Sequence, residues 1–295
     1  MSTATLAGAV TVTAPGLWRD MPDAVYHADP VPGGSLSSTG ARRLLPPSCP
    51  AVFDWYRRNP EPAKKAYDLG HAAHDTLLGG GPEIAVVDAE NWLTKAAKAQ
   101  RDEAHERGAV PILTAEKAEI DAMVAAVRAH PFAGRLFEPG TGIGEASCFW
   151  TDDETGVWRR SRLDWLPDNH AGSRMILPDF KTCKSAQRDE FAKSAASYGY
   201  HQQGAYYVDA VRALELADDV AFVFVAVEKA RPYLVNVIQL DASAMRIGDA
   251  LNRKAIRVYA ECLAADQWPA YSTDVELASL PAYYERQNEG LIYEQ

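Results

Sequence analysis

The chain has 295 residues, of which 47% are hydrophobic and 24% charged, and this composition is ordinary for a globular protein of one large domain or two small ones. A net charge of −10 argues against a protein that coats nucleic acid by charge alone, although it leaves room for a local basic groove. No apolar run reaches the roughly 18–20 residues of a membrane span. The N-terminal MSTATLAGAVTVTAPG also lacks the basic flank and apolar core of a secretory signal, so we expect a soluble, cytoplasmic protein.

Four cysteines are scattered singly along the chain, without a C-x-x-C pair: Cys49, Cys148, Cys183 and Cys262. This spacing argues against a zinc or iron–sulfur site and is typical of reduced thiols in a cytosolic protein. We therefore expect no iron–sulfur cluster.

The first part of the chain is predicted to be a short lead-in over residues 1–30, followed by a helical part over about 35–140. SLSSTGARRLL offers Ser and Thr caps ahead of apolar residues at helical spacing, and AVFDWYRRN continues that pattern. KKAYDLGHAAHDTLLGG places apolar residues at steps of three and four and ends in a glycine run. Two further helices are expected in NWLTKAAKAQRDEAHERG and TAEKAEIDAMVAAVRAHP.

The pattern changes to strands at about residue 144. GEASCFWTDDETGVWRRSRLDWLP predicts two strands joined by a turn at TDDETG, and RMILPDF predicts a third. One helix over FAKSAASYGYHQQGAYYVDAVRAL, strands in DVAFVFVAVEK and YLVNVIQL, and a long helix over about 242–265 follow. We expect one mixed α/β domain over 31–295, with a central mixed sheet over about 144–240 flanked by helices.

The third predicted strand ends in an acid and a base that share a face, Asp179 and Lys181, because residues i and i+2 of a strand point the same way. The strand before it ends in Asp164, with Arg160 and Arg162 on the same face as that acid. If the two strands are neighbours, Asp164 and Asp179 meet at one end of the sheet. The alternative is a surface ion pair between Asp179 and Lys181.

Two converging carboxylates repel each other unless a cation lies between them, and Mg²⁺ prefers such hard oxygen ligands. A lysine beside the ion can orient or deprotonate a water and stabilise a pentavalent phosphate. These properties predict metal-assisted phosphodiester hydrolysis at the tip of a buried, central strand.

Two further patterns, one on a predicted glutamine- and tyrosine-containing helix and one formed by two histidines, allow either a functional or a structural role. Gln203 and Tyr207 lie at i and i+4 of a predicted helix, with Tyr200 one turn earlier on the same face. These groups could hold a DNA backbone or orient the lysine, and the tyrosines could equally pack into the core. His71 and His74 lie one turn apart, which suits either metal binding or a helix surface.

Taken together, these segments resemble the PD-(D/E)XK nuclease superfamily, and within it the RecE-type (exonuclease VIII-like) phage recombination exonucleases and their RecB-like relatives. The resemblance runs from SLSSTGARRLL to ADQWPAY and includes, in order, the G-x-x-x-H helix of DLGHAAHDTLL with Gly70 and His74, the strand GEASCFW, the acid of RSRLD, the D-x-K of LPDFKT and the Q-x-x-x-Y of QGAYY. The proline of the superfamily's name is absent before Asp164, and the second acid is an aspartate. The ligand oxygens survive both departures.

The resemblance implies roles for individual residues. The implied metal ligands are His74, Asp164, Asp179 and the Phe180 carbonyl, with Glu145 as a further ligand, a supporting residue, or a partner of Arg162. The implied catalytic residues are Lys181, Asp179, Asp164, Gln203 and Tyr207, with Lys181 positioning the attacking water. The candidate DNA contacts are Arg160, Arg162 and Tyr200, of which the arginines are as often structural ion pairs. Mg²⁺ or Mn²⁺ is the expected cofactor.

The activity implied by the resemblance is a metal-dependent exonuclease on double-stranded DNA ends. It would run 5′→3′ and leave single-stranded tails for phage-type recombination, with a RecT-like annealing protein as partner. A homo-oligomer, such as a ring-shaped tetramer, is also implied, and a ring would fit the acidic net charge because only its channel must be positive. The alternatives are a structure-specific or single-strand endonuclease with the same site, and a catalytically silent DNA-binding protein of the same fold.

Overall fold

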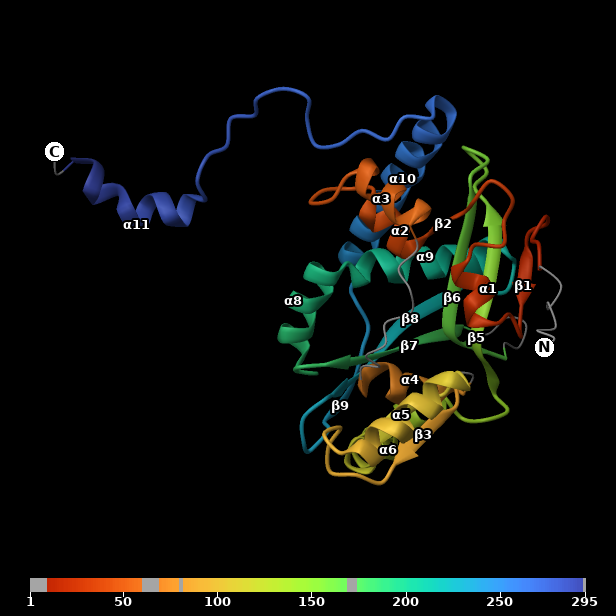
Figure 1. The fold of residues 1–295 in the computed structure, drawn as a ribbon. Coiled ribbons are helices and arrows are strands. Elements are labelled where there is room, and N and C mark those ends of the chain that lie inside the picture. The colour runs from red at the N-terminus through yellow and green to blue at the C-terminus, as the bar shows by residue number, and fades with distance from the viewer. Residues whose placement is uncertain (1–9, 60–68, 80–81, 169–173, 294–295) are drawn as a thin grey trace.

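The computed structural model describes residues 10–59, 69–79, 82–168 and 174–293 (Figure 1). The described strands form a four-stranded sheet of order β1-β5-β6-β2, a three-stranded sheet β7-β8-β9 and a two-stranded sheet β3-β4. Their bounds are β1 Gly16–Trp18, β2 Leu36–Ser37, β3 Ile84–Val87, β4 Val110–Leu113, β5 Gly142–Thr151, β6 Trp158–Pro167, β7 Met175–Cys183, β8 Val220–Glu228 and β9 Val235–Ile238. Parallel and antiparallel pairs occur together, which confirms the predicted mixed α/β class.

Helices lie on both sides of the strands (Figure 1). Their bounds are α1 Asp23–His27, α2 Ser38–Arg43, α3 Pro50–Arg58, α4 Leu69–Leu78, α5 Lys95–Glu106, α6 Thr114–Ala129, α7 Ala133–Leu136, α8 Arg188–Tyr198, α9 Tyr200–Ala213, α10 Ala242–Ala265 and α11 Ala282–Tyr293. Helices α9, α10 and α2 cover one side of β7 and β8, and α4 and α6 cover the other. In the part of the chain that the structure describes, no helix is both long and apolar enough to cross a membrane.

The sequence of strand β8, VAFVFVAVE, is almost entirely apolar because both faces of the strand are buried. Phe224 and Ala226 join the larger core beneath α9 and α10. Val225 and Val227 point the other way and join the core that α4 and α6 form with the sheet. A strand buried on both faces needs a continuous apolar run rather than an alternating one.

Strand β7 lies between β8, to which it is hydrogen-bonded in parallel, and β6, which contacts it from the neighbouring sheet. Within the hydrogen-bonded sheet β7-β8-β9 the central strand is β8, whereas the sequence analysis predicted that β7 is central. The alternation along β7 puts Leu177 in the core under α9, and Asp179 and Lys181 follow on that same face. Phe180 points to the opposite core, under α4.

The predicted hairpin of β5 and β6 is present and antiparallel, with Ala146 opposite Leu163. Asp152 begins the turn, and its carboxylate accepts hydrogen bonds from the Thr155 N–H (3.1 Å) and hydroxyl (2.8 Å). This local bonding is the physical basis of the turn that the sequence predicted.

Two predictions for the N-terminal half need correction. The expected lead-in contributes β1, which pairs with β5, and Val12, Met21 and Tyr26 pack around Phe149, since the edge of β5 offers both hydrogen bonds and an apolar surface. The expected helical part also contains β2, β3 and β4. Strands of two to four residues are too short to show the alternation of apolar and polar residues by which a strand is predicted. The predicted extension of α4 before Leu69 lies outside the described residues.

Two predictions for the C-terminal half also differ. The single helix expected over 191–214 is two helices, because Gly199 adopts a left-handed conformation (φ +70°) that ends α8 and begins α9. The long helix predicted over 242–265 is confirmed as α10. Beyond Trp268, which stacks on Phe53 at 5.4 Å, the chain leaves the body and ends in α11, a helix that the sequence analysis missed (Figure 1).

Candidate metal centre

Glu145 and Asp164 occupy opposite positions of the β5–β6 hairpin, between the paired residues Gly144↔Trp165 and Ala146↔Leu163. The Glu145 backbone is left-handed (φ +55°), a conformation that costs a non-glycine residue about 1–2 kcal/mol. Such strain persists where the surrounding structure enforces it and is frequent at functional sites. An ion pair with the Arg162 Nε further fixes the Glu145 carboxylate.

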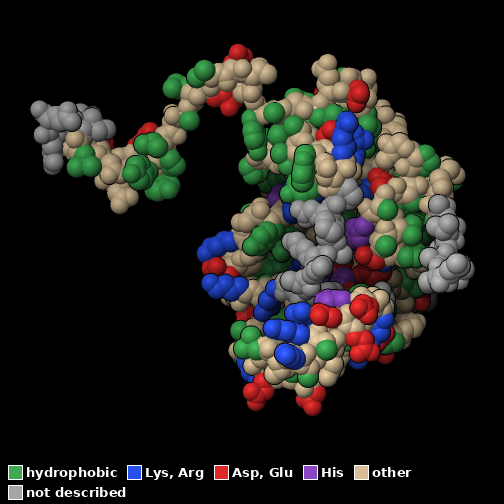
Figure 2. All heavy atoms as spheres, in the orientation of Figure 1, with side chains coloured by type: hydrophobic (Ala, Val, Ile, Leu, Met, Phe, Trp, Pro, Cys, Tyr) green, Lys and Arg blue, Asp and Glu red, His purple; other side chains and the backbone are tan. Residues whose placement is uncertain are grey.

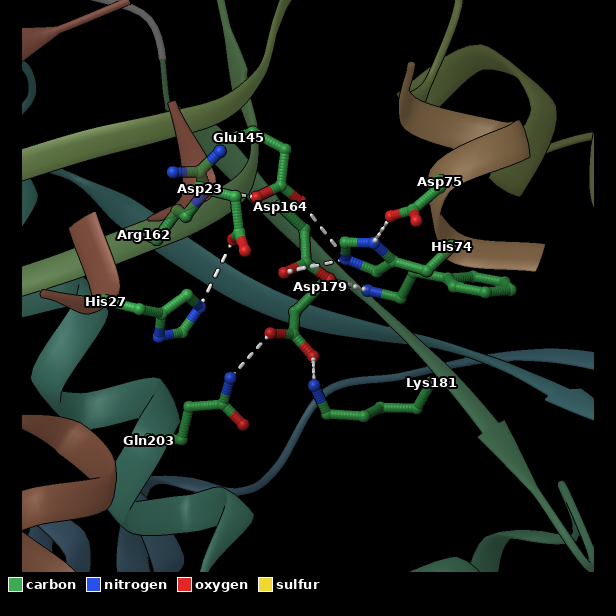
Figure 3. Close-up of polar contacts among 11 residues, drawn as sticks. Asp23, His27, His74, Asp75, Glu145, Arg162, Asp164, Asp179, Lys181 and Gln203 are labelled. Carbon is green, nitrogen blue, oxygen red and sulfur yellow. Dashed lines mark hydrogen bonds and ion pairs between the residues drawn. The ribbon is translucent and has the colours of Figure 1, made fainter. Parts of the chain in front are cut away.

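His74 reaches both carboxylates from α4 (Figure 3). Its Nε2 lies 3.4 Å from Glu145 Oε1 and 3.4 Å from Asp164 Oδ1. The three residues each offer a ligand atom, and these atoms lie within 4.8 Å of one another. The structure therefore brings His74, and not the exposed His71, to the acids.

Two glycines let α4 approach the strands closely enough for this contact. A Cβ at Gly70 would lie 2.5 Å from the Thr182 hydroxyl oxygen of β7. A Cβ at Gly144 of β5 would lie 2.7 Å from the Leu78 carbonyl oxygen, at the other end of α4. Real Cβ atoms do not come so close, so glycine at both positions permits the helix to carry His74 into the site.

Asp179 lies beside this group and is completely buried. Its Oδ1 accepts a hydrogen bond from the Gln203 amide nitrogen of α9 (2.8 Å), and its Oδ2 pairs with the Lys181 Nζ (Figure 3). The Phe180 N–H, between the acid and the base, donates to Asp164 Oδ2 (2.7 Å) and so ties β7 to β6. The two aspartates therefore converge, as the strand pattern predicted, and the D-x-K pair joins a buried aspartate to a half-buried lysine rather than forming a surface ion pair.

The pKa values of the three carboxyl groups shift in different directions. Burial, together with the neighbouring Asp164, raises the pKa of Asp179 to about 7. Burial alone would also raise the pKa of Asp164, but His74 and Lys181 outweigh it and lower that pKa. Burial and the Asp164 carboxylate raise the pKa of Glu145, even though His74 and Arg162 oppose the change. When His74 is neutral, the three acids therefore outnumber the two cations Arg162 and Lys181.

The two bases of the site remain protonated more readily than in water. Burial would lower the pKa of Lys181, but Asp179 and Asp164 more than compensate and raise it. The same holds for His74, whose pKa Asp164 and Glu145 raise against the effect of burial. Of the two roles left open by the sequence, an ammonium group at Lys181 fits the orientation of a water or phosphate and does not fit its deprotonation.

The donor set fits a divalent cation. One imidazole nitrogen and two carboxylates from three separate elements, with the buried Asp179 carboxylate next to them, form a mixed oxygen and nitrogen site of the kind that Mg²⁺ or Mn²⁺ accepts. His74, Glu145 and Asp164 would hold the ion. Asp179 would join them by exchanging its pairing with Lys181 for the ion, and its part in metal binding stays a prediction, as does that of the Phe180 carbonyl.

The remaining predicted residues lie around this centre. Tyr207 is half-buried against Phe222, and burial raises the pKa of its hydroxyl well above the usual value. The Tyr200 ring lies 5.5 Å from the Lys181 Nζ. Both candidate arginines are already engaged: Arg160 with Asp29 and Ser35, and Arg162 with Glu145 and the Met21 carbonyl. These contacts favour the structural alternative for the arginines.

Sequence analysis missed Asp75, whose Oδ1 lies 3.3 Å from the His74 Nδ1 on the side away from the acids. Burial and the nearby Glu145 raise the pKa of Asp75 to about 6. A carboxylate on the second nitrogen of a metal-binding histidine orients its ring. The one sequence feature that could have indicated this contact is that Asp75 directly follows His74.

Figure 2 shows one face of the molecule, on which histidine and acidic side chains lie near the centre of the body and lysine and arginine side chains lie at its lower left. All four cysteines are free, and Cys183 is the half-buried one. The expectation that the protein holds no iron–sulfur cluster stays a prediction.

Comparison with known proteins identifies the fold and the family of this chain. The crystal structure of an Eubacterium rectale protein described as a "putative exonuclease" superposes with a TM-score of 0.54 at 11% sequence identity, covering 87% of this chain and 93% of that one. At this identity the likeness establishes the fold. A search of curated proteins finds no match. Residues 54–281 match the family described as "PDDEXK-like domain of unknown function (DUF3799)", and the chain therefore belongs to this PDDEXK-like family.

Proposed function

We propose that the protein is a divalent-metal-dependent nuclease that hydrolyses DNA phosphodiester bonds. One observation carries the proposal: ligand atoms of His74, Glu145 and Asp164 lie within 4.8 Å of one another, next to the ion pair of the buried Asp179 and the half-buried Lys181. An acid-rich centre with a lysine at its side is suited to attack by water on a phosphodiester. An inherited but silent fold would have no need to keep all five groups.

A bound Mg²⁺ or Mn²⁺ would supply Lewis-acid polarisation of a phosphoryl oxygen and a lowered pKa for water. The chain's own contribution is to position charge. The Lys181 ammonium, held by Asp179, lies where it can contact a phosphate and stabilise the negative charge that develops on it. Gln203 in turn fixes the Asp179 carboxylate from α9.

The metal-binding groups are themselves held in place by neighbours. Arg162 fixes the Glu145 carboxylate, and the Phe180 N–H fixes Asp164. Asp75 contacts the ring nitrogen of His74 that faces away from the acids. Preorganised ligands of this kind lose little freedom when an ion binds, which favours metal affinity.

We further propose that the substrate is the end of double-stranded DNA and that the protein is an exonuclease running 5′→3′. The description of the Eubacterium rectale protein as an exonuclease and the resemblance to RecE-type enzymes support this choice. A ring-shaped homo-oligomer, a RecT-like annealing partner and a role in phage-type recombination follow from the same resemblance.

The test is digestion of linear duplex DNA labelled at the 5′ or the 3′ end, beside a covalently closed circle. Each substrate is incubated with Mg²⁺, with Mn²⁺ and with EDTA. Lys181→Ala is the test variant, and Lys117→Ala, which removes a half-buried lysine paired with Asp121 on α6, is the matched control. We expect metal-dependent early release of the 5′ label, an intact circle, an inactive Lys181 variant and an active Lys117 variant.

Other results would change the proposal in defined ways. Nicking of the closed circle would indicate an endonuclease with the same site. Early release of the 3′ label would reverse the polarity. Failure to cut any DNA with either ion would contradict nuclease activity and favour a DNA-binding protein. Size-exclusion chromatography with light scattering tests the ring.

A further inference from the structure

We infer that the junction of α8 and α9 forms a nucleotide-binding subsite next to the metal centre, in which Tyr198 stacks on an unpaired nucleobase and Arg42 binds a neighbouring phosphate. The inference rests on the proposed function, because it takes the substrate to be DNA. It adds to that function a preference for a strand whose bases are unpaired near the site of cleavage.

Tyr198 is an exposed aromatic residue with a rigid support behind it. The side chain ends α8 and is 59% exposed. Its ring lies 5.7 Å from the Tyr200 ring at an angle of 30°. Tyr200 in turn packs against Phe191 and Phe224, which belong to the core. The core thus supports Tyr200, and Tyr200 supports the inner face of the Tyr198 ring. The rest of the Tyr198 side chain is open to solvent.

This aromatic pair leads directly to the proposed catalytic lysine. The Lys181 Nζ lies 5.5 Å from the Tyr200 ring centre, a cation–π distance. The Tyr198 ring centre is therefore within about 11 Å of that ammonium group. This span corresponds to about three base steps at 3.4 Å each. A strand with a phosphate at Lys181 can reach Tyr198 with a base within a few nucleotides.

Arg42 supplies the positive charge at the same junction. A Cβ at Gly199, the residue between the two tyrosines, would lie 2.6 Å from the Arg42 Cδ, so the arginine stem lies along this turn. The side chain is exposed, and within the described residues no carboxylate pairs with its guanidinium. Its neighbour Arg43 differs, because that guanidinium lies 4.0 Å over the Tyr56 ring.

An aromatic surface beside an exposed arginine is suited to single-stranded nucleic acid. Each base presents a π-face, so stacking on Tyr198 tolerates any sequence, and the guanidinium contacts the backbone. A base inside a duplex already stacks on its neighbours and is not available. The bound nucleotide therefore comes from a frayed or single-stranded end.

The experiment measures binding without cleavage. A fluorescein-labelled duplex with a short single-stranded extension is titrated with the full chain in EDTA, and the Kd is read from fluorescence anisotropy. We expect Tyr198→Ala to weaken binding about 5- to 150-fold, and Tyr198→Phe to bind like the unchanged protein. Arg42→Ala is expected to weaken binding and to reduce the slope of log K against log salt by about one.

Controls separate stacking from loss of structure. Tyr283→Ala removes a tyrosine of similar exposure (68%) on α11, away from the site, and should leave the Kd unchanged. An extension in which the stacked base is replaced by an abasic site should bind the unchanged protein as weakly as intact DNA binds Tyr198→Ala. On the abasic DNA, the Tyr198 substitution should have no further effect.

The subsite is wrong if Tyr198→Ala binds DNA as the unchanged protein does, or if Tyr198→Ala and the abasic site weaken binding independently. The proposed nuclease activity would still stand in that case, provided that Mg²⁺-dependent cleavage of DNA is observed. Conversely, binding that depends on Tyr198 and Arg42 without cleavage under any metal would keep the subsite and overturn the proposed nuclease.

Discussion

Two clusters of charged side chains lie along the same strand, β6, and they differ in how their charges are matched. At the start of β6, Arg159 pairs with Asp209 and approaches Asp152 (3.8 Å), while Arg253 pairs with Asp152. Two arginines thus face two aspartates. Arg159 is only 2% exposed, and its guanidinium lies over the Trp150 and Tyr206 rings.

Toward the other end of β6 the balance of charge depends on a histidine. Glu145, Asp164 and Asp179 face Arg162 and Lys181, with His74 between them, so the three acids are matched by three cations only while His74 is protonated. Burial and the Asp164 carboxylate raise the pKa values of Asp179 and Glu145, whereas His74 and Lys181 lower the pKa of Asp164 itself. The first cluster is complete without any further ion, whereas the second is the site where we propose that a divalent cation binds.

The largest effect on stability is expected from breaking the balanced cluster. Arg159→Ala removes a side chain that is 2% exposed and packed over the Trp150 and Tyr206 rings, and it leaves Asp209 without its arginine, while Asp152 keeps Arg253. The lost packing should lower the free energy of unfolding by about 2–5 kcal/mol. Urea denaturation measures the change. Arg253→Ala, whose side chain is 31% exposed, is the matched control and should cost less. An equal or larger loss in the control would contradict this interpretation.

The unbalanced cluster should gain stability from a divalent ion. Saturation at a hundred times the Kd stabilises a protein by about 2.7 kcal/mol, so Mn²⁺ or Mg²⁺ should raise Tm relative to EDTA. Asp164→Asn should abolish the rise, because it removes a ligand. Asp209→Asn, in the balanced cluster, should keep it. A metal-dependent rise that survives in Asp164→Asn would place the ion elsewhere.

The excess of acid should also appear in the pH dependence of the metal-free protein. The pKa of Asp179 is about 7 in the folded protein against 3.8 as its ordinary value, so between these pH values the unfolded chain binds fewer protons at this residue. The free energy of unfolding should therefore fall as pH rises from about 4 to 7, by up to a few kcal/mol, and level off above 7. Asp179→Asn should flatten this decline.

Denaturation in EDTA at pH 5 and pH 8 measures the decline in both proteins. The unchanged protein saturated with Mn²⁺ is the comparison, and it should resemble Asp179→Asn in its smaller decline. If the variant and the metal-free protein lose the same stability between these pH values, Asp179 is not the group that resists ionisation.

The smallest expected effect concerns the residue that orients His74. Asp75→Asn should weaken metal binding about tenfold, since the amide is a poorer partner for the His74 Nδ1. Isothermal titration with Mn²⁺ measures the affinity. Asp121→Asn, which alters an exposed carboxylate on α6, should leave the affinity unchanged. An unchanged affinity in Asp75→Asn would show that packing alone orients the histidine.

Particular residues show how far the sequence reaches. The i, i+2 relation of Asp179 and Lys181 was readable from the strand pattern, because side-chain direction in a strand depends only on local backbone geometry. The choice between His71 and His74 came from the family resemblance, and the structure agrees with it. The engagement of Arg160 by Asp29 was not readable, since 131 residues separate the two along the chain.

What the sequence by itself determined is local: the hairpin at TDDETG, the long helix α10, the apolar run of β8 and the order of the acid, base and amide motifs. What only the tertiary structure decided is which of these groups meet. Glycines at 70 and 144 let α4 approach β5 and β7, and this approach places His74 against Glu145 and Asp164. The physical reason is that periodicity and capping act within a few residues, whereas burial and charge pairing depend on the whole packed chain.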